Sequence, residues 1–313
     1  MKMLQTLALY LLASPASAQT IGIVTTPAGS FSNSTGQAIA KVLVDKAKLR
    51  AVVQAQASTG FEEVESGSAD FNVSNSFDAT FFATGTGEYQ GQGKKPVMRY
   101  VGALIPYRVA MHVRADSGIK NINELKGKRV SSDFNAQKTI ARIIEAHLAN
   151  AGLDYKDVVK VPAPNVVRQA EDFMSGKVDV LFFALGAAAI KQANASVGGL
   201  RVLEVATSAE AMRRTEALIP GAYVVNVSPN PALDGITTPT NLVAFDMVLI
   251  TNAKVPDEVV YKVAKALHDN KEDLRATFAP FGLFQPKSMA KALKGVPMHA
   301  GAVKYYKEIR LLN

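Results

Sequence analysis

The sequence has no cysteine among its 313 residues. Disulfide bonds are therefore excluded, and the folded chain must be stabilised by its buried core, for which this length is ample. A lipid anchor is excluded as well, because exported bacterial lipoproteins carry it on a cysteine directly after the signal peptide. We expect a protein that is neither cross-linked nor lipid-anchored.

Long hydrophobic runs are also missing. No window holds 18 uncharged apolar residues, so no transmembrane helix is predicted. The short apolar stretch Leu4–Leu12 follows Lys2 and precedes Ala16-Ser17-Ala18, which is the layout of a secretory signal peptide over residues 1–18. The alternative is the N-terminal helix of a cytosolic protein. Because an exported protein without an anchor would diffuse away from a cell that lacks an outer membrane, we expect a soluble protein in a Gram-negative periplasm.

Motifs for catalysis and for metal or cofactor binding are absent. The four histidines include no pair at the H-x-x-H or H-x-x-x-H spacing of zinc sites. The chain has no G-x-S-x-G sequence and no Walker A sequence. Gly85-Thr86-Gly87 does not follow a strand and open a helix, so it does not predict a dinucleotide site. We expect no catalytic residue, no metal and no cofactor, and hence no enzyme.

Acidic residues are fewer than basic residues. The chain has 27 acidic and 35 basic residues, and its formal net charge is +8. A nucleic-acid-binding protein would gather its basic residues on one face. Here they are spread along the chain without a run longer than two, and the aromatic residues, at 7%, do not interleave with them. We therefore predict no nucleic-acid partner, and a surface that favours small anions.

The segments that are present alternate between strand and helix patterns. Thr20–Thr26 is rich in β-branched residues and is followed by helical spacing of apolar residues. Val178–Phe183 is continuously apolar, as in a parallel sheet buried on both faces. Val97–Ile105 and Arg108–Val113 are predicted as two strands separated by Pro106. This alternation predicts an α/β architecture.

A short internal repeat divides the chain into two similar series. The pattern S-G-x-x-D-apolar occurs at Ser66–Phe71 and again at Ser175–Val180. Each copy lies between a predicted helix and a predicted strand, and each glycine is placed to end its helix in the left-handed conformation. The matching order of elements around both copies predicts two similar α/β lobes.

The loop after the first strand of each series is a candidate binding loop, because ligands in open parallel sheets lie beyond the carboxyl ends of the strands. Thr25–Ser34 is dense in hydroxyl groups and has no charge, and in Ser131–Thr139 the cation Lys138 starts a helix. A cation there is unfavourable unless an anion offsets it. The alternative for Thr25–Ser34 is a solvated polar loop without a ligand, and the alternative for Lys138 is an exposed surface lysine. If the loops bind, Ser30→Ala and Lys138→Ala weaken binding and leave the stability of the unliganded protein nearly unchanged.

Several longer motifs occur in a fixed order. They include His112-Val113-Arg114-Ala115-Asp116-Ser117-Gly118-Ile119, Leu125-Lys126-Gly127-Lys128-Arg129-Val130 and, near the end, Pro297-Met298-His299. With this ordered set the chain resembles the TAXI-type solute-binding proteins of TRAP transporters, over nearly all residues after the first 18.

The resemblance implies a periplasmic binding protein-like (type II) α/β fold. Two lobes with mixed, mostly parallel sheets would enclose a ligand cleft, with lobe 1 formed by residues 19–112 and 250–313 and lobe 2 by residues 113–249. The implied function is a monomeric periplasmic receptor that captures a small organic anion, carboxylate or amino-acid-like, and delivers it to TRAP membrane permease subunits. A receptor linked to an ABC transporter or to a sensor is the alternative on the same fold.

The resemblance also assigns contact residues. In lobe 1 they are Ser30, Phe31, Ser32, Asn33, Ser58, Thr59, Gly60, Asn75, Ser76 and Asp78, and in lobe 2 they are Phe134, Asn135, Gln137, Lys138, Thr139 and Ala184. Arg108 is a further candidate because it lies near the crossing between the lobes. The family's glycine-rich first loop is interrupted here by Pro27 and Phe31, and its A-P-G-S-G-T loop is replaced in residues 133–139. Specificity for glutamate is therefore not implied.

Overall fold

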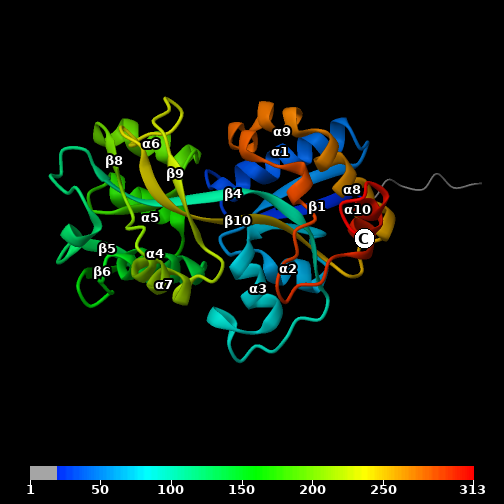
Figure 1. The fold of residues 1–313 in the computed structure, drawn as a ribbon, viewed down its shortest axis with the longest axis horizontal. Helices are drawn as coiled ribbons and strands as arrows, with labels where there is room; N and C mark the ends of the chain where they lie inside the picture. The colour runs from blue at the N-terminus through cyan, green and yellow to red at the C-terminus, as the bar shows by residue number, and fades with distance from the viewer. Residues whose placement is uncertain (1–19) are drawn as a thin grey trace, which may run out of the picture.

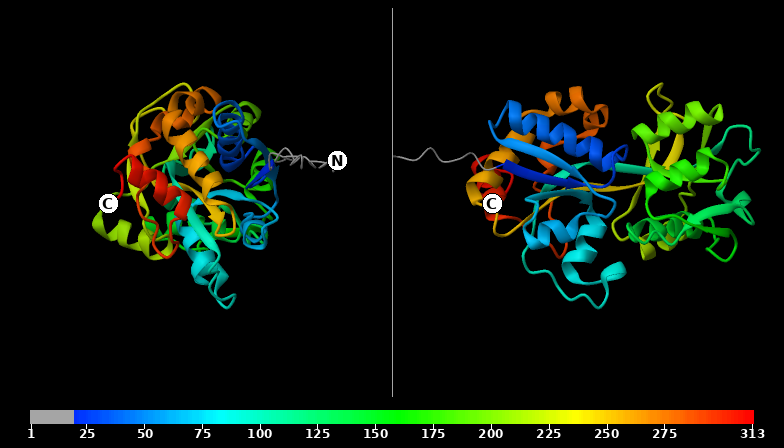
Figure 2. Two further views of the ribbon diagram at one scale, coloured as in Figure 1. Left: turned by 90° about the vertical axis from the view of Figure 1, so that its right-hand side faces the viewer. Right: turned by 180° about the vertical axis from the view of Figure 1, so that it is seen from behind.

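Two long strands run through both halves of the structure, a computed structural model that describes residues 20–313. They are β4 (Met98–Arg114) and β10 (Thr240–Asn252), which pair antiparallel and join two α/β lobes (Figure 1). Seen from behind, the same division into two lobes is clear (Figure 2). The signal peptide predicted for residues 1–18 lies outside the described residues.

Lobe 1 is built on β1 (Thr20–Thr25), β2 (Arg50–Ala55) and β3 (Phe71–Asn75), which pair parallel to one another. The strand order is β2-β1-β3-β10-β4, so β10 lies between β3 and β4. The antiparallel pairings of the described sheet all involve β4 or β10. The lobe 1 sheet is therefore mixed because β10, which returns from the other lobe, runs antiparallel to its neighbours β3 and β4.

Helices cover both faces of the lobe 1 sheet, as the views in Figures 1 and 2 show. Buried apolar residues from both layers form the core against the sheet. One face carries α1 (Phe31–Asp45), α8 (Asp257–Asp269), α9 (Lys271–Thr277) and α10 (Ala300–Glu308), and the other carries α2 (Phe61–Ser66) and α3 (Ser76–Thr84). The short 3-10 helices of this lobe are η1 (Gly87–Tyr89), η3 (Ala279–Leu283) and η4 (Pro286–Ser288).

Lobe 2 extends the crossing strands with short strands of its own. β7 (Leu181–Ala184) and β8 (Leu200–Leu203) pair with β4, β9 (Tyr223–Val227) pairs with β10, and β5 (Arg129–Ser132) and β6 (Val159–Pro162) form a separate parallel pair. The helices are α4 (Thr139–Asn150), α5 (Val166–Met174), α6 (Ala188–Val197) and α7 (Ala209–Leu218), with the 3-10 helix η2 (Ile122–Leu125). No helix among residues 20–313 is long and apolar enough to span a membrane.

Pro106 does not divide its region into two strands as predicted, because β4 continues through it. The pairing with β10 shifts its register here, between Asp246, which faces Pro106, and Val248, which faces Ala103. A proline has no N–H group to give to the ladder, and a bulge is one of the few places where a sheet tolerates it. The crossing therefore lies within continuous strands, and the boundaries predicted at residues 112/113 and 249/250 fall inside β4 and β10.

The two aspartates of the repeated pattern make equivalent contacts in the two lobes. In lobe 1, the Asp70 carboxylate accepts a hydrogen bond from Gly22 N at 2.8 Å, and Asp70 N donates to Gly22 O at 3.0 Å. In lobe 2, Asp179 makes the same pair of bonds with Arg129, at 2.8 and 2.9 Å. The repeat thus marks one structural unit that is used twice, in which an aspartate ties the third strand of its lobe to the first.

Helix α10 packs very closely against the start of α8. Gly301, in the first turn of α10, is buried, and a Cβ atom on it would lie 2.1 Å from the carbonyl oxygen of Asp257. Only a residue without a side chain fits there, so Gly301 sets the distance between the C-terminal helix and α8.

Candidate functional site

A small cavity of about 40 Å³ lies between the lobes and is lined by residues of both. It is located at the carboxyl ends of β1 and β3 and at the N-terminal ends of α1, α3, α4 and α5, where the strands and helices of both lobes converge. The residues that line it are Thr26, Ser32, Thr59, Val73, Ser74, Asn75, Asp78, Tyr107, Gln137, Thr139, Ile140, Val166 and Met247. We call it the cleft cavity.

The lobe 1 side of the cleft cavity is fixed by side chains that also cap helices or bond to strands. Ser32 Oγ donates to Val73 O at 2.8 Å, which ties α1 to β3. Asn75 Oδ1 accepts a hydrogen bond from Asp78 N at 2.8 Å and so caps α3. These bonds hold a rigid polar wall in place without a ligand.

The lobe 2 side is less fully bonded. Gln137 Oε1 accepts a hydrogen bond from Val166 N at 3.0 Å. Helix α4 begins at Thr139 without a side-chain cap. In its first turn Ile140 N donates to Gln137 O at 2.9 Å, and no side chain caps the other N–H groups. Thr139 is buried, and its Oγ1 atom has no hydrogen-bond partner among the described residues.

Asp78 is the most unusual group of the cleft cavity. Its side chain is only 2% exposed, and its Oδ1 atom has no hydrogen-bond partner within residues 20–313. Burial raises the pKa of this carboxyl from 3.8 to about 7, the nearby hydroxyls of Thr139 and Tyr89 oppose the rise, and the charges of Glu88 and Glu62 add to it. No lysine, arginine or histidine is among the cavity-lining residues of the described chain. Asp78 is therefore poised to hold a proton near neutral pH.

Contacts between the lobes surround the cleft cavity. The Arg142 guanidinium of α4 forms an ion pair with Glu88 of lobe 1 and lies 5.5 Å from the centre of the Phe81 ring. A second contact is a backbone hydrogen bond, in which Ala189 N of lobe 2 donates to Gly29 O of lobe 1 at 3.4 Å. The lobes are thus in contact at two places. A space of 40 Å³ accommodates little more than a water molecule or two.

Six of the residues assigned by resemblance are brought together in this cavity, and they come from both lobes. They are Ser32, Thr59, Asn75, Asp78, Gln137 and Thr139. The structure also adds wall residues that the loop analysis missed, among them Tyr107 from β4 and Met247 from β10. Their signal in the sequence is weak, because residues of long strands contribute to the site only where the chain crosses between lobes.

The remaining lobe 1 residues of the assignment do not line the cavity. Ser30 caps α1, accepting from Asn33 N at 3.1 Å, and the Asn33 side chain donates to Thr25 Oγ1 at 3.0 Å. Phe31 is a core residue, with its ring centre 5.0 Å from that of Tyr107. Gly60 has a φ of +79°, and a Cβ atom there would lie 2.6 Å from Val24. Ser58 and Ser76 are half-buried outside the lining.

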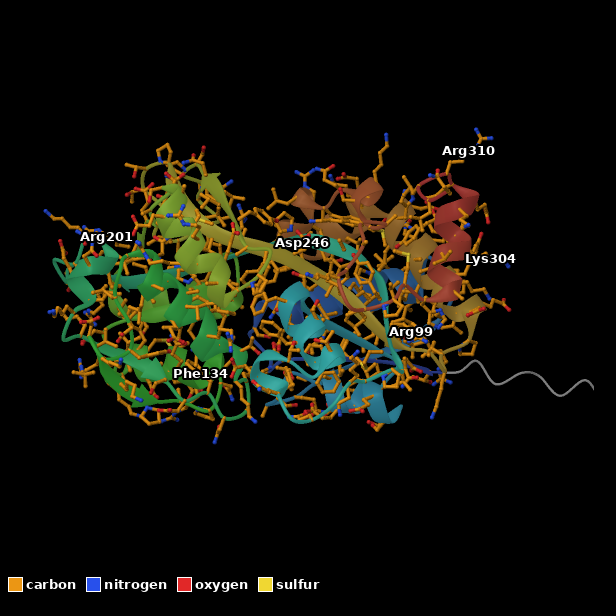
Figure 3. The ribbon with its side chains drawn as sticks, turned by 60° about the horizontal axis from the view of Figure 1, so that its bottom comes forward. Arg99, Phe134, Arg201, Asp246, Lys304 and Arg310 are labelled. Atoms are coloured by element: carbon orange, nitrogen blue, oxygen red, sulfur yellow. The ribbon has the colours of Figure 1, made fainter. Side chains whose placement is uncertain are left out.

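Four assigned residues of lobe 2, and Arg108 near the crossing between the lobes, lie away from the cleft cavity. Asn135 and Lys138 are exposed, and neither side chain is part of the cavity wall. Phe134 is fully buried inside lobe 2 (Figure 3), and Ala184 is buried at the end of β7. Arg108 lines a different cavity. Of the two alternatives for Lys138, the structure favours the exposed lysine.

The contacts of Ser30 change the expected effect of its replacement. Ser30→Ala removes the side-chain cap of α1 and should lower the free energy of unfolding by about 1 kcal/mol, rather than leave it unchanged. Ser34→Ala, one turn further along the same helix, is the matched control and should be neutral or slightly stabilising, because alanine is the better helix former. Urea denaturation measures both variants, and equal losses of stability would contradict the capping role.

The residues from 20 to 313 contain no group of three histidine, aspartate or glutamate side chains close enough to hold a metal ion. The polar groups of the cleft cavity are instead hydroxyls, amides and a single carboxyl. This is the chemistry of a site that recognises a ligand by hydrogen bonds.

Comparison with known proteins gives one family and one fold. Residues 23–309 match the model of the NMT1-like family. The structure is similar to the periplasmic binding protein BugD, with a TM-score of 0.61 and 13% identity over 93% of this chain and 94% of that one. It is also similar to R. palustris Rpa4515 with adipate, with a TM-score of 0.56 and 14% identity over 93% and 92% of the two chains.

A third similar structure is the alkanesulfonate-binding protein SsuA from Xanthomonas axonopodis pv. citri bound to MOPS, with a TM-score of 0.51 and 15% identity over 94% of both chains. At these identities the likeness concerns the fold. It confirms the predicted periplasmic binding protein-like α/β class.

Proposed function

The chain belongs to the NMT1-like family, and from that premise we propose that it is a substrate-binding protein that captures a small solute between its lobes for a membrane transporter. The observation that carries the proposal is the cleft cavity, where both lobes present polar groups and where Asp78 Oδ1 and Thr139 Oγ1 are buried without partners. An unsatisfied buried polar group costs about 1 to 3 kcal/mol. A ligand that bonds to these atoms would recover that cost.

Binding in this cavity requires the lobes to move apart. Sites for small molecules have volumes of roughly 300–1,000 Å³, whereas the cleft cavity has about 40 Å³. We propose that residues 113–249 rotate against residues 19–112 and 250–313 about β4 and β10, and that the Arg142–Glu88 ion pair breaks on opening. Closure around the solute then restores that ion pair.

We propose a small organic acid as the solute. The uncapped N-terminal turn of α4 supplies N–H donors and the positive end of a helix dipole, and protonated Asp78 and Thr139 supply two more donors. The similar structures that are described with adipate and with MOPS also hold organic acids. The anion would therefore be bound by neutral donors, without a basic side chain in the cleft cavity.

For the transporter we propose a TRAP-type permease that works with this protein as a periplasmic monomer. The support is the ordered set of motifs shared with TAXI-type receptors. An ABC transporter remains the second candidate, because one similar structure is described as the substrate-binding protein of an amino acid ABC transporter. A neighbouring gene for a large multi-span permease would support the first candidate, and one for an ATP-hydrolysing subunit the second.

A thermal-shift screen followed by calorimetry tests the function. Dicarboxylates, keto acids, sulfonates and amino acids are added at increasing concentration, and a true solute should stabilise the folded state by about 2.7 kcal/mol at 100 times its dissociation constant. Binding should have 1:1 stoichiometry. The absence of stabilisation by every organic acid would contradict the proposal.

The variant Thr139→Val tests whether the solute binds in the cleft cavity. Valine keeps the shape of threonine and removes a buried hydroxyl that has no hydrogen-bond partner among the described residues. At pH 5, where Asp78 is protonated and the hydroxyl has no charge to stabilise, the stability of the unliganded protein should be unchanged or slightly higher. The dissociation constant of the solute should rise about tenfold, because one hydrogen bond of about 1.4 kcal/mol is lost. The exposed Thr207→Val serves as the control. Unchanged affinity in Thr139→Val would move the binding site elsewhere.

A further inference from the structure

A second cavity, of about 720 Å³, is lined by none of the residues that line the cleft cavity. Tyr107 and Arg108 are consecutive in β4, and successive side chains of a strand point to opposite faces. Tyr107 lines the cleft cavity, whereas Arg108 lines the second one. We call the second one the rear cavity.

Both lobes contribute to the wall of the rear cavity. Lobe 2 contributes Gly186, Lys191 of α6 and three residues of a loop, Asn230, Ala232 and Leu233. Lobe 1 contributes Arg275 of α9 and the residues that follow it, Thr277, Phe278, Ala279, Pro280, Gly282 and Leu283. Helices α6 and α9 lie on the same side of the crossing strands (Figure 1). A molecule bound here would therefore touch both lobes.

The charge of the rear cavity is entirely positive. Its lining includes Arg108, Lys191 and Arg275, and no aspartate or glutamate of the described chain is part of it. Glu272 pairs with Arg275 at 3.3 Å. For Arg108, burial lowers the pKa and no carboxylate acts against the shift. At least one half-buried cation thus faces this space without a counter-charge among residues 20–313, which is costly unless an anion is bound.

The N-terminal end of helix α6, which lies at the rear cavity, is also positive. Gly186 lines the cavity and directly precedes Ala187, the N-cap residue of the ten-residue helix α6, which has no side-chain cap bond. The positive end of the α6 helix dipole is therefore close to the cationic side chains.

The remaining wall of the rear cavity is apolar. Phe278, Pro280 and Leu233 line it, and Leu283 is 38% exposed, one of the few large hydrophobic side chains of the described chain with so much exposure. Exposed apolar surface that adjoins unpaired cations is the pattern expected for an amphipathic anion, whose chain covers the apolar wall while its head group meets the charges.

We propose that the rear cavity binds an organic anion with an apolar chain, such as a medium-chain carboxylate. Its head group lies between Arg108 and Lys191, and its chain covers Phe278 and Leu283. This site is distinct from the cleft cavity, because the two cavities share no lining residue. The site bridges α6 and α9, so its occupation fixes the angle between the lobes. Binding of the anion must therefore change the affinity of the cleft cavity for the solute, and the solute must change the affinity for the anion by the same factor.

Isothermal titration calorimetry of the full chain with octanoate tests this site. Wild type should bind one octanoate, whereas acetate, which lacks the chain, and octyltrimethylammonium, which reverses the charge, should bind at least tenfold more weakly. Arg108→Gln and Lys191→Gln should each raise the dissociation constant of octanoate at least fivefold. Lys191 is exposed, so its replacement does not threaten folding.

Two further variants locate the octanoate. Lys307→Gln removes a cation of α10 that is not part of the rear cavity and should leave the dissociation constant within a factor of two. Thr139→Val, in the cleft cavity, should also leave it within a factor of two. The proposal is overturned if octanoate does not bind, if octyltrimethylammonium binds as tightly, or if Thr139→Val weakens octanoate while Arg108→Gln does not.

Discussion

Replacing Asp78 with asparagine should raise the free energy of unfolding of the unliganded protein at pH 8 by up to about 4 kcal/mol. At pH 4 the same variant should be nearly as stable as wild type. The reason is the position of the carboxyl, which is 2% exposed in a cavity without a basic side chain among the described residues and has its pKa raised from 3.8 to about 7.

The direction of the effect follows from proton binding. Between pH 3.8 and about 7 the folded state holds a proton on Asp78 that the unfolded chain has lost. The stability of wild type therefore falls as the pH rises through this window, and it stays lower above pH 7. Asparagine has almost the same shape and does not ionise, so the variant lacks this loss.

Asp116→Asn is the matched control for this prediction. Its side chain is 73% exposed, and the Arg114 guanidinium lowers its pKa, so removing the charge should change stability little at any pH. Urea denaturation from pH 4 to pH 8 gives the curves for both variants. If the difference between Asp78→Asn and wild type does not grow with pH, the raised pKa is wrong.

Asp78 should also make the affinity for the solute depend on pH. Whether the affinity rises or falls with pH indicates the charge of the solute group that contacts Asp78. An organic acid binds best to protonated Asp78, so its affinity should fall as the pH rises from 6 to 8, by up to about tenfold per unit above the pKa. In Asp78→Asn this dependence should disappear. A solute that contacts Asp78 with an ammonium group would show the opposite slope and lose affinity in the variant.

A second large effect is expected from Gly301→Ala, which should destabilise the protein by about 3 kcal/mol through overpacking. The new Cβ atom would lie 2.1 Å from Asp257 O and 2.9 Å from Asp257 C, and both are backbone atoms that cannot rotate away. Helix α10 must therefore move away from α8, which loosens the packing of buried residues such as Tyr305 and Tyr306.

Gly282→Ala provides the comparison, because a Cβ atom there meets nothing closer than the Arg275 side chain at 3.6 Å. It should change the free energy of unfolding by less than about 1 kcal/mol. Thermal and urea unfolding distinguish the two variants. Similar small losses in both would show that α10 can shift without cost, and that the close approach does not stabilise lobe 1.

Much of the fold could be predicted from local patterns. The alternation of strands and helices gave the α/β class, and the repeat around Asp70 and Asp179 gave two lobes, because a short motif fixes the same helix-to-strand turn wherever it occurs. The continuity of β4 through Pro106 could not be predicted in this way. It depends on the bulge in the pairing with β10, whose residues are about 140 positions away in the sequence.

The candidate site was predictable in its loops and not in the direction of its side chains. Neighbouring residues of a helix point about 100° apart, so an error of one position turns a side chain from the cavity to solvent. Thr139 faces the cleft cavity and Lys138 does not. Tyr107 and Met247 escaped prediction because only the crossing of two distant strands brings them to the cavity.

The strand order also determines when each lobe can form during synthesis. Because β10 lies between β3 and β4, the lobe 1 sheet is incomplete until residue 252 is available. Residues 115–239, between the two crossing strands, are made before β10 is complete. Domains fold as units when their residues become available, so the helices of lobe 2 and its short strands other than β9, which pairs with β10, can pack before lobe 1 closes. Lobe 1, which contains the first strands of the chain, is therefore the last lobe to be completed.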